Sequence, residues 1–332
     1  MTSERRLSRA SITSVHPLRA VEGGRVTILG TGFAFDPLPD VTIDGVSTRV
    51  SFASSNRLAV VVPGEHEGGR AAIKVSGTSG ETAFISIGAT WATGLHQVDN
   101  PVFDAKGDLF VTYSGSRGQE AAVSVFRVTQ RGTREPFGSG IVNATSMAVG
   151  PDGLLYVSSR FEGTVYRLDA EGAHVKVASD LGVSCGLAFD QEGRLYVGDR
   201  SGTIFRVVDG ETTVFATLPP SVAAFHLAMS PEQELFVTAP TLNPYDHIYR
   251  IDRDGQVGTV PSPLGRPQGL AFAPDGTLHV VEALAGASGV YRFPRLDATP
   301  ELVVSAATLV GVAFGPQGEM VVASNDTAYR FE

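Results

Sequence analysis

An internal repeat is the feature that most constrains the fold of this chain. Each copy consists of an apolar strand, a turn built on Pro-Asp-Gly or a related sequence, and a second apolar strand. The clearest copies occupy residues 149–157, 189–197 and 272–280. Together with three weaker copies, they place the fourth turn position at residues 107, 153, 193, 233, 276 and 318, with spacings of 40 to 46 residues. That period is typical of one four-stranded propeller blade, so six copies predict a six-bladed β-propeller.

The composition is consistent with an all-β, globular and soluble chain. Its 332 residues are 42% hydrophobic, and its 38 glycines and 19 prolines fall mostly in turns between short apolar runs. A formal charge of -9 argues against a nucleic-acid partner, since phosphate binding depends on clustered Lys and Arg. No apolar run approaches the roughly 18 residues of a membrane-spanning helix, so we expect no membrane partner. Cys185 is the only cysteine, which excludes an internal disulfide.

The first twenty residues lack the apolar segment of a secretion signal. We therefore expect a cytoplasmic location, or a secreted protein if a leader was removed.

Residues 11–88 lack the repeat and are expected to form a separate domain after a disordered tail at 1–10. Their short alternating strands predict a small β-sandwich. The motif that they share with a known family consists of Ile12, Val15 and Pro17, then Gly23-Gly24, Val26 and Ile28, Gly30-x-Gly32-Phe33, and Val62-Pro63. On these residues the segment resembles the IPT/TIG family. The resemblance implies an immunoglobulin-like fold that serves as a spacer or interaction module, without catalysis.

The propeller is predicted to span residues 89–332 and to close through its two ends. The last copy contains only three strands, at 310–314, 320–323 and 328–331. The segment 89–95, which includes Trp91, is positioned to supply the missing outer strand. Pairing the two ends in one blade would leave no open sheet edge at the seam.

The repeat copies at 185–197 and 268–280 resemble the NHL and SMP-30/gluconolactonase propeller families. In the gluconolactonase-like enzymes, the resemblance implies a divalent metal at the top of the central channel, held by acidic and Asn side chains before the innermost strands. Counting back eight residues from each turn position gives Asp99, Thr145, Cys185, Phe225, Gln268 and Val310. Only Asp99 is acidic, and a single carboxylate supplies too few oxygen ligands for a hard divalent cation. We expect most of the metal site to be lost, with Asp99 as the one candidate ligand, and leave open whether Ca²⁺ or another divalent cation binds.

The candidate catalytic residues are Asp99, His226 and Glu282. A histidine at a channel mouth can act as a general base near neutral pH, with Asp199 or Glu282 as its carboxylate partner. The competing interpretation is that His226 is a hydrogen-bonded filler between blades. Candidate ligand-binding residues at the same end of the propeller are Asn100, Thr145, Arg160, Cys185, Asp199, Arg200, Phe225, Tyr245 and Gln268. Asp199 also suits a turn cap, and Cys185 a buried structural thiol.

Three functional hypotheses follow. The first is an SMP-30/gluconolactonase-like propeller that binds a small organic ligand of lactone or sugar-acid type over the channel, as a lactone hydrolase if it is an enzyme. The second is a non-catalytic NHL-type scaffold that binds a protein through the propeller or through the IPT/TIG-like domain. The third is a metal-independent enzyme similar to strictosidine synthase, with Glu282 as the working carboxylate.

Overall fold

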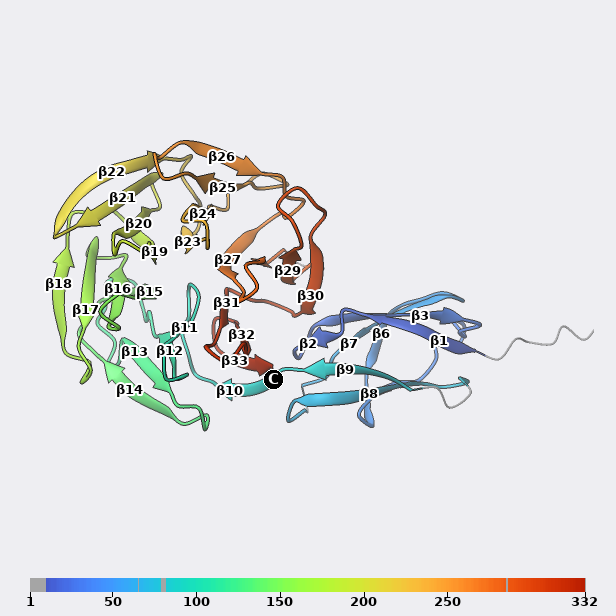
Figure 1. Ribbon diagram of the computed structural model, residues 1–332. Helices are drawn as coiled ribbons and strands as arrows, with labels where there is room; N and C mark the ends of the chain where they lie inside the picture. The colour runs from blue at the N-terminus through green and yellow to red at the C-terminus, as the bar shows by residue number, and fades with distance from the viewer. Residues whose placement is uncertain (1–9, 65, 79–81, 285, 332) are drawn as a thin grey trace, which may run out of the picture.

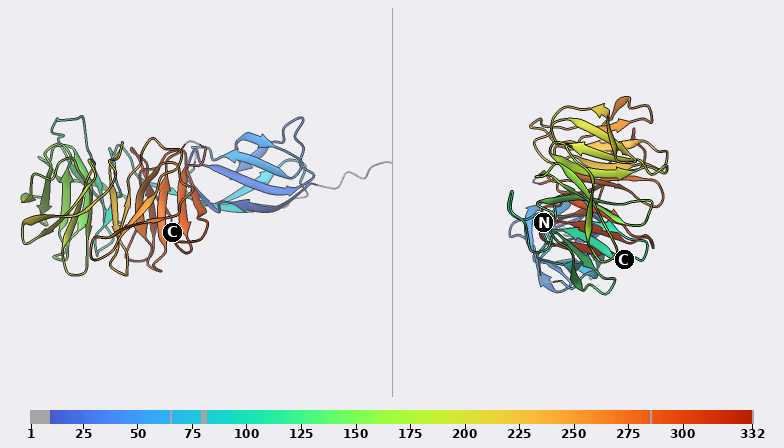
Figure 2. Two further views of the ribbon diagram at one scale, coloured as in Figure 1. Left: turned by 90° about the horizontal axis from the view of Figure 1, so that it is seen from above. Right: turned by 90° about the vertical axis from the view of Figure 1, so that its left-hand side faces the viewer.

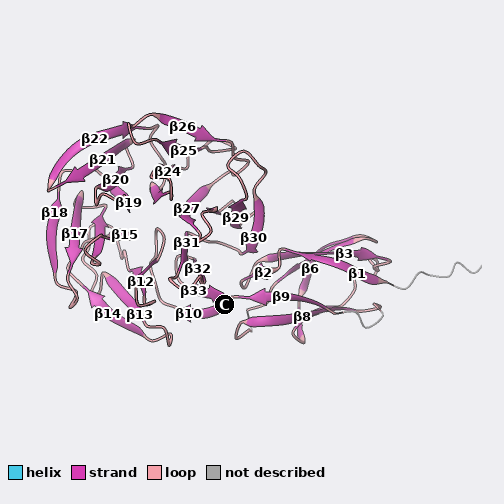
Figure 3. Ribbon diagram, viewed as in Figure 1, coloured by secondary structure: helices cyan, strands magenta, loops and turns pink. Residues whose placement is uncertain are grey.

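The computed structural model describes residues 10–64, 66–78, 82–284 and 286–331, and every regular element in these ranges is a β-strand (Figures 1 and 3). Most of the expected disordered tail, residues 1–9, lies outside the described residues. Its last member, Ala10, is buried and forms a β-bridge with Thr78. The described part of the chain contains no helix long and apolar enough to cross a bilayer.

Six four-stranded antiparallel blades form a ring, as the repeat predicts (Figure 1). Blade one contains β11 (Val102–Phe103), β12 (Leu109–Thr112), β13 (Val125–Val128) and β14 (Arg134–Gly138). Blade two contains β15 (Ala144–Val149), β16 (Leu155–Ser159), β17 (Thr164–Leu168) and β18 (His174–Ala178). Blade three contains β19 (Ser184–Phe189), β20 (Leu195–Asp199), β21 (Thr203–Val208) and β22 (Glu211–Thr217).

The remaining blades follow the same order. Blade four contains β23 (His226–Met229), β24 (Leu235–Thr238), β25 (Ile248–Ile251) and β26 (Val257–Val260). Blade five contains β27 (Pro267–Phe272), β28 (Leu278–Glu282), β29 (Gly289–Phe293) and β30 (Glu301–Ser305). Blade six contains β31 (Gly311–Phe314), β32 (Met320–Ala323), β33 (Ala328–Phe331) and the early strand β10 (Ala89–Ala92).

The repeated turn has a backbone cause. At the six marker positions φ lies between 65° and 88°, and five of the six residues are glycine, with Gln233 as the exception. Glycine adopts this left-handed conformation without the strain that a side chain adds. In blade three, the Oδ1 of Asp190 accepts hydrogen bonds from the backbone N–H groups of Glu192 and Arg194, at 3.1 and 2.9 Å. In this blade, the aspartate three residues before the glycine therefore fixes the turn between the first two strands.

The ring closes as expected from the sequence. Strand β10 pairs with β33, with Ala89 opposite Arg330, so that the two ends of the propeller share one blade. Trp91 in β10 is buried, and its ring lies 5.9 Å from that of Phe103 in the next blade. This seam joins blade six to blade one by packing as well as by hydrogen bonds.

The N-terminal domain is a β-sandwich. One sheet has the order β1 (Ser11–His16), β3 (Arg25–Thr31), β7 (Arg57–Val61) and β6 (Arg49–Ala53). The other contains β2 (Arg19–Ala20), β9 (Ala83–Ile87), β8 (Gly69–Val75), β4 (Val41–Ile43) and β5 (Val46–Ser47). Inward-facing aliphatic residues of both sheets form one continuous core.

The second sheet of the sandwich continues into the propeller. Strand β2 pairs in parallel with both β9 and β30, which produces one nine-stranded sheet from β27 to β5 (Figures 1 and 2). Val21, directly after β2, packs into the core between blades five and six. The Tyr329 hydroxyl in β33 is 2.7 Å from Oε1 of Glu22. The sandwich is therefore fixed to blades five and six by backbone pairing rather than by a linker alone.

Candidate functional site

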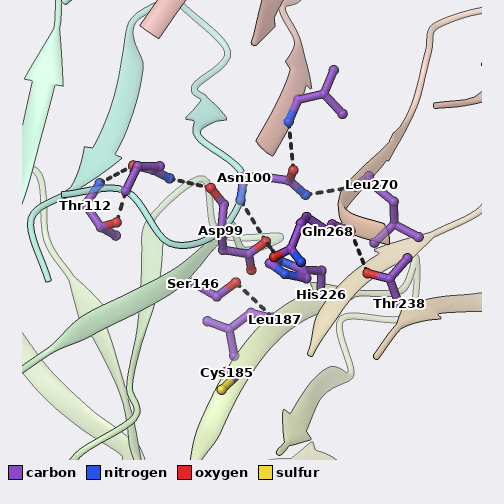
Figure 4. Close-up of polar contacts among 12 residues, drawn as sticks. Asp99, Asn100, Thr112, Ser146, Cys185, Leu187, His226, Thr238, Gln268 and Leu270 are labelled. Carbon is purple, nitrogen blue, oxygen red and sulfur yellow. Dashed lines mark hydrogen bonds and ion pairs between the residues drawn. The ribbon is translucent and has the colours of Figure 1, made fainter. Parts of the chain in front are cut away.

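Asp99 and His226 meet inside the propeller (Figure 4). Asp99 precedes β11 of blade one, and His226 begins β23 of blade four, which is three blades further round the ring. The Oδ1 atom of Asp99 lies 2.6 Å from Nδ1 of His226. Because a carboxylate accepts, Nδ1 carries the proton. The expectation that Asp199 or Glu282 is the partner of this histidine was wrong, since Asp99 holds that position.

Asn100 extends this connection to two further blades. Its Nδ2 donates to the carbonyl oxygen of Leu270 in blade five, at 2.8 Å, and its Oδ1 accepts from the N–H of Val312 in blade six, at 2.9 Å. A Cβ atom built on Gly269 would lie 2.2 Å from Oδ1 of Asn100, and one on Gly311 would lie 2.7 Å from its Cα. The inner strands therefore need glycine where Asn100 packs against them.

The pair of Asp99 and His226 is enclosed. The side chain of Asp99 is 4% exposed and that of His226 is 0% exposed. Nε2 of His226 has no hydrogen-bond partner among the described residues. A histidine oriented by a carboxylate has the arrangement of a general base, but a ligand would have to reach a ring that solvent does not reach. In this structure the hydrogen bond between Asp99 and His226 connects opposite blades, and we call this pair the cross-channel pin.

The ring positions counted back from the turn glycines present few free oxygen atoms. Oδ1 of Asp99 already accepts from His226 and from the backbone N–H of Asn100, at 2.7 Å. The ring positions beside it carry the buried side chains of Thr145, Cys185 and Phe225. Within the described ranges, no group of three or more His, Cys, Asp or Glu side chains is arranged to hold a metal ion.

Glu282 lies away from the pair and has a structural position. Its carboxylate accepts hydrogen bonds from the backbone N–H groups of Gly265, Arg266 and Leu284, at 2.6, 3.0 and 2.6 Å. It therefore holds the loop that connects blades four and five to the β28–β29 loop. Asp199 does the same in blade three, where it accepts from the N–H of Val183 at 2.8 Å.

Three other predicted ligand-binding residues are buried in the propeller: Thr145, Cys185 and Phe225. Cys185 is buried, and burial is the main cause that raises the pKa of its thiol to about 12, which leaves it unreactive near neutral pH. Thr145 and Phe225 are fully buried, while Tyr245 is exposed on the β24–β25 loop. The side chain of Gln268 lies next to Asp99 and His226 (Figure 4).

Arg160 and Arg200 do meet, in a pocket that the sequence did not define. Its volume is about 440 Å³, and it lies at the top face, which we define as the end where the inner strands begin. Arg117 from the β12–β13 loop joins them there, and Asn143, Phe161 and Val183 line the walls. Among the described residues, no carboxylate forms an ion pair with any of these three arginines. The pKa of Arg160 is lowered mainly by burial, and the charges of Arg117 and Arg200 lower it further.

A second histidine lies close to this pocket. His96 packs edge to face on Tyr113, with ring centroids 5.9 Å apart. Its pKa is lowered by burial and, secondly, by the positive charge of Arg160. Sequence reasoning missed His96, Arg117 and Phe161. Counting back eight residues from each turn position finds only the starts of the inner strands. His96 lies before the first strand of blade one, and Arg117 and Phe161 lie in loops of variable length.

Comparison with known proteins agrees with this architecture. The IPT/TIG domain family model matches residues 10–90, and the model described as strictosidine synthase-like, N-terminal, matches residues 186–207. A pentonolactonase of Haloferax volcanii is 31% identical over 116 residues, which is 34% of this chain and 40% of that protein. The chain thus spans less than half the length of this curated relative.

Solved structures show the same fold at low sequence identity. An auxiliary nutrient binding protein from Bacteroides ovatus aligns over 98% of both chains, with a TM-score of 0.56 and 14% identity. A gluconolactonase from Xanthomonas campestris aligns with 73% of this chain and 88% of its own, with a TM-score of 0.59 and 16% identity. The chain therefore combines an N-terminal IPT/TIG domain with a six-bladed β-propeller of the SMP-30/gluconolactonase-like fold.

Proposed function

We propose that this protein binds a small organic ligand of sugar-acid or lactone type in the pocket of Arg117, Arg160 and Arg200, and that the bound form carries a negative charge. The observation that supports this most is the grouping of three guanidinium groups in one pocket without an ion-paired carboxylate among the described residues. The whole chain has a formal charge of -9, so this positive cluster runs against its overall balance.

Arginine is suited to this role. Its planar group donates two parallel hydrogen bonds to a carboxylate or phosphate. Like charges that share a partly buried pocket repel one another, and a bound anion would relieve that repulsion. The volume of about 440 Å³ falls in the ordinary range for small-molecule sites.

Lactone hydrolysis is the second candidate, and the match to a pentonolactonase favours it. In that reaction water would add to the lactone carbonyl, the ring C–O bond would break, and the water proton would pass to the leaving oxygen. His96 is partly buried and is influenced by the charge of Arg160, and its lowered pKa keeps it neutral, as a base requires. The product would be a hydroxy acid whose carboxylate suits the three arginines.

Calorimetric titration with gluconate and with its uncharged lactone tests the binding proposal. We expect gluconate to bind to the intact protein and Arg160→Gln to weaken that binding by about tenfold or more, because charge-assisted hydrogen bonds contribute about 1.5–3 kcal/mol. Arg253→Gln is the matched control, since Arg253 lies in the β25–β26 turn at the opposite end of the propeller. Equal affinity of wild type and Arg160→Gln would contradict the proposal, and turnover of the lactone would support the second candidate.

If neither compound binds, the top face has no sugar-acid or lactone site. The scaffold hypothesis, in which the propeller or the IPT/TIG domain binds a protein, would then be preferred.

A further inference from the structure

Resting on the anion-binding site proposed above, we infer that this pocket binds a carboxylate attached to an apolar ring, aromatic or alicyclic, more tightly than it binds a sugar acid. The inference concerns the body of the ligand rather than its charge. It depends on which hydrogen-bonding groups and which apolar surfaces the pocket walls present.

The polar side chains of the pocket wall present almost only hydrogen-bond donors. Arginine has five N–H donors and no acceptor. Asn143 is the one lining side chain with an acceptor oxygen, and that oxygen already accepts from the N–H of Gly118 at 2.7 Å. Its Nδ2 donates to the carbonyl oxygens of Ser114 and Ser116, at 2.6 and 2.9 Å. Asn143 thus holds the loop around Gly118, and both protons of its amide group are used within the protein.

The carboxylate beside Gly182 is also occupied. Asp199 lies beside Gly182, where a Cβ would come within 2.6 Å of its Oδ2. Asp199 is only 5% exposed and accepts hydrogen bonds from Val183 and Ser201. The backbone oxygen of Val183 accepts from the N–H of Arg200, at 3.2 Å. The hydroxyl groups of a sugar acid donate as well as accept. A hydroxyl buried in this pocket would find few acceptors among the lining side chains, which would lower the affinity by about tenfold.

The remaining wall is apolar and accessible. Phe161 is 55% exposed and Val183 is 40% exposed, although both line a pocket. The Phe161 ring lies against the backbone of Gly118, where a Cβ would be 2.9 Å from the ring. One side of this aromatic ring is thereby in contact with the protein, while much of its surface faces solvent. A flat or cyclic hydrocarbon body would cover it and gain the stacking contact that aromatic pairs prefer.

The test is a titration of the full-length chain with four probes: benzoate, cyclohexanecarboxylate, gluconate and the uncharged benzamide. We expect both ring acids to bind about tenfold or more tightly than gluconate, and benzamide to bind much more weakly than benzoate. Phe161→Ala should reduce the affinity for the two ring acids while leaving that for gluconate within about twofold. Phe35→Ala is the matched control, because Phe35 is 57% exposed but lies in the IPT/TIG domain.

The outcomes separate the inference from the function on which it rests. If gluconate binds as tightly as benzoate, and Arg160→Gln weakens both, the pocket binds anions but the preference for an apolar ring is wrong. If Phe161→Ala weakens gluconate and benzoate equally, the ring has no selective role and the inference fails. If none of the acids binds, the proposed function itself is refuted.

Discussion

Replacing His226 by alanine should destabilise the propeller strongly, because it removes one half of the pin across the channel. His226 is fully buried, and its Nδ1 lies 2.6 Å from Oδ1 of Asp99. After the substitution, that oxygen keeps only the N–H of Asn100, at 2.7 Å, while the rest of the carboxyl group remains buried.

The expected size follows from two contributions. A hydrogen bond to a charged group is worth about 1.5–3 kcal/mol. The deleted ring also leaves a cavity in a packed region, and large-to-alanine changes at such sites cost about 2–5 kcal/mol in total. Together these agree with the roughly 3–5 kcal/mol measured when one partner of a buried pair is removed. For a domain of this size, about 4 kcal/mol corresponds to a decrease of about 10 °C in Tm.

Urea unfolding followed by tryptophan fluorescence is a suitable assay. Trp91 is the only tryptophan and lies in β10, the strand that closes the ring, so its signal reports on the propeller. The single variants His226→Ala and Asp99→Ala, with their double variant, form a cycle that isolates the pair. We expect a coupling free energy of about 1.5 kcal/mol or more.

His279 provides the control. It is 5% exposed in blade five, and its ring lies 4.9 Å from that of Phe314, away from Asp99. His279→Ala combined with Asp99→Ala should be additive within about 0.5 kcal/mol. A His226→Ala variant within about 1 kcal/mol of wild type, or a coupling no larger than that of the control, would refute the pin.

Three further predictions follow from the same structure. Cys185, whose pKa burial raises to about 12, should not react with a thiol reagent at pH 8 in the folded protein and should react fully after unfolding; stoichiometric labelling of the folded chain would contradict this. Gly269→Ala should lower the free energy of unfolding by about 3 kcal/mol because its Cβ would lie 2.2 Å from an oxygen, whereas Gly258→Ala, with its nearest atom at 3.7 Å, should have little effect. His96 should titrate by NMR below the ordinary value of about 6.5, and Arg160→Gln should raise its pKa. Since the unfolded chain then binds more protons than the folded one, the contribution of His96 to stability is present above about pH 6.5 and is lost as pH falls. An unchanged midpoint of the His96 titration in Arg160→Gln would exclude the arginine as a cause of the lowered pKa.

The fold was predictable because its signals are local. The turn glycines need a positive φ, and the acidic residue of the turn, as at Asp190, accepts hydrogen bonds from backbone N–H groups two and four residues later. Both requirements are visible in short stretches of sequence, so the repeat, the number of blades and the closing strand around Trp91 followed directly. The sandwich was recognisable for the same reason, since its Gly-Gly turn and alternating strands are contiguous in the chain.

The site was predictable only in part. Asp99, His226, Arg160 and Arg200 were all identified as facing the same end of the propeller. Their grouping was not, because a contact between blades one and four joins residues 127 positions apart. Glu282 resembled a catalytic acid in sequence, yet its oxygens accept hydrogen bonds from the backbone of the loop between blades four and five.

The sequence by itself determined the blades, the ring and the IPT/TIG domain, since turn chemistry and strand alternation act over a few residues. The tertiary structure decided which polar side chains meet. It placed Asp99 against His226 in a closed channel and Arg117 beside Arg160 and Arg200 in an open pocket. It also decided that β2 pairs with β30, so that two domains share one sheet. These contacts depend on loop lengths and on the packing of distant strands, which no local pattern encodes.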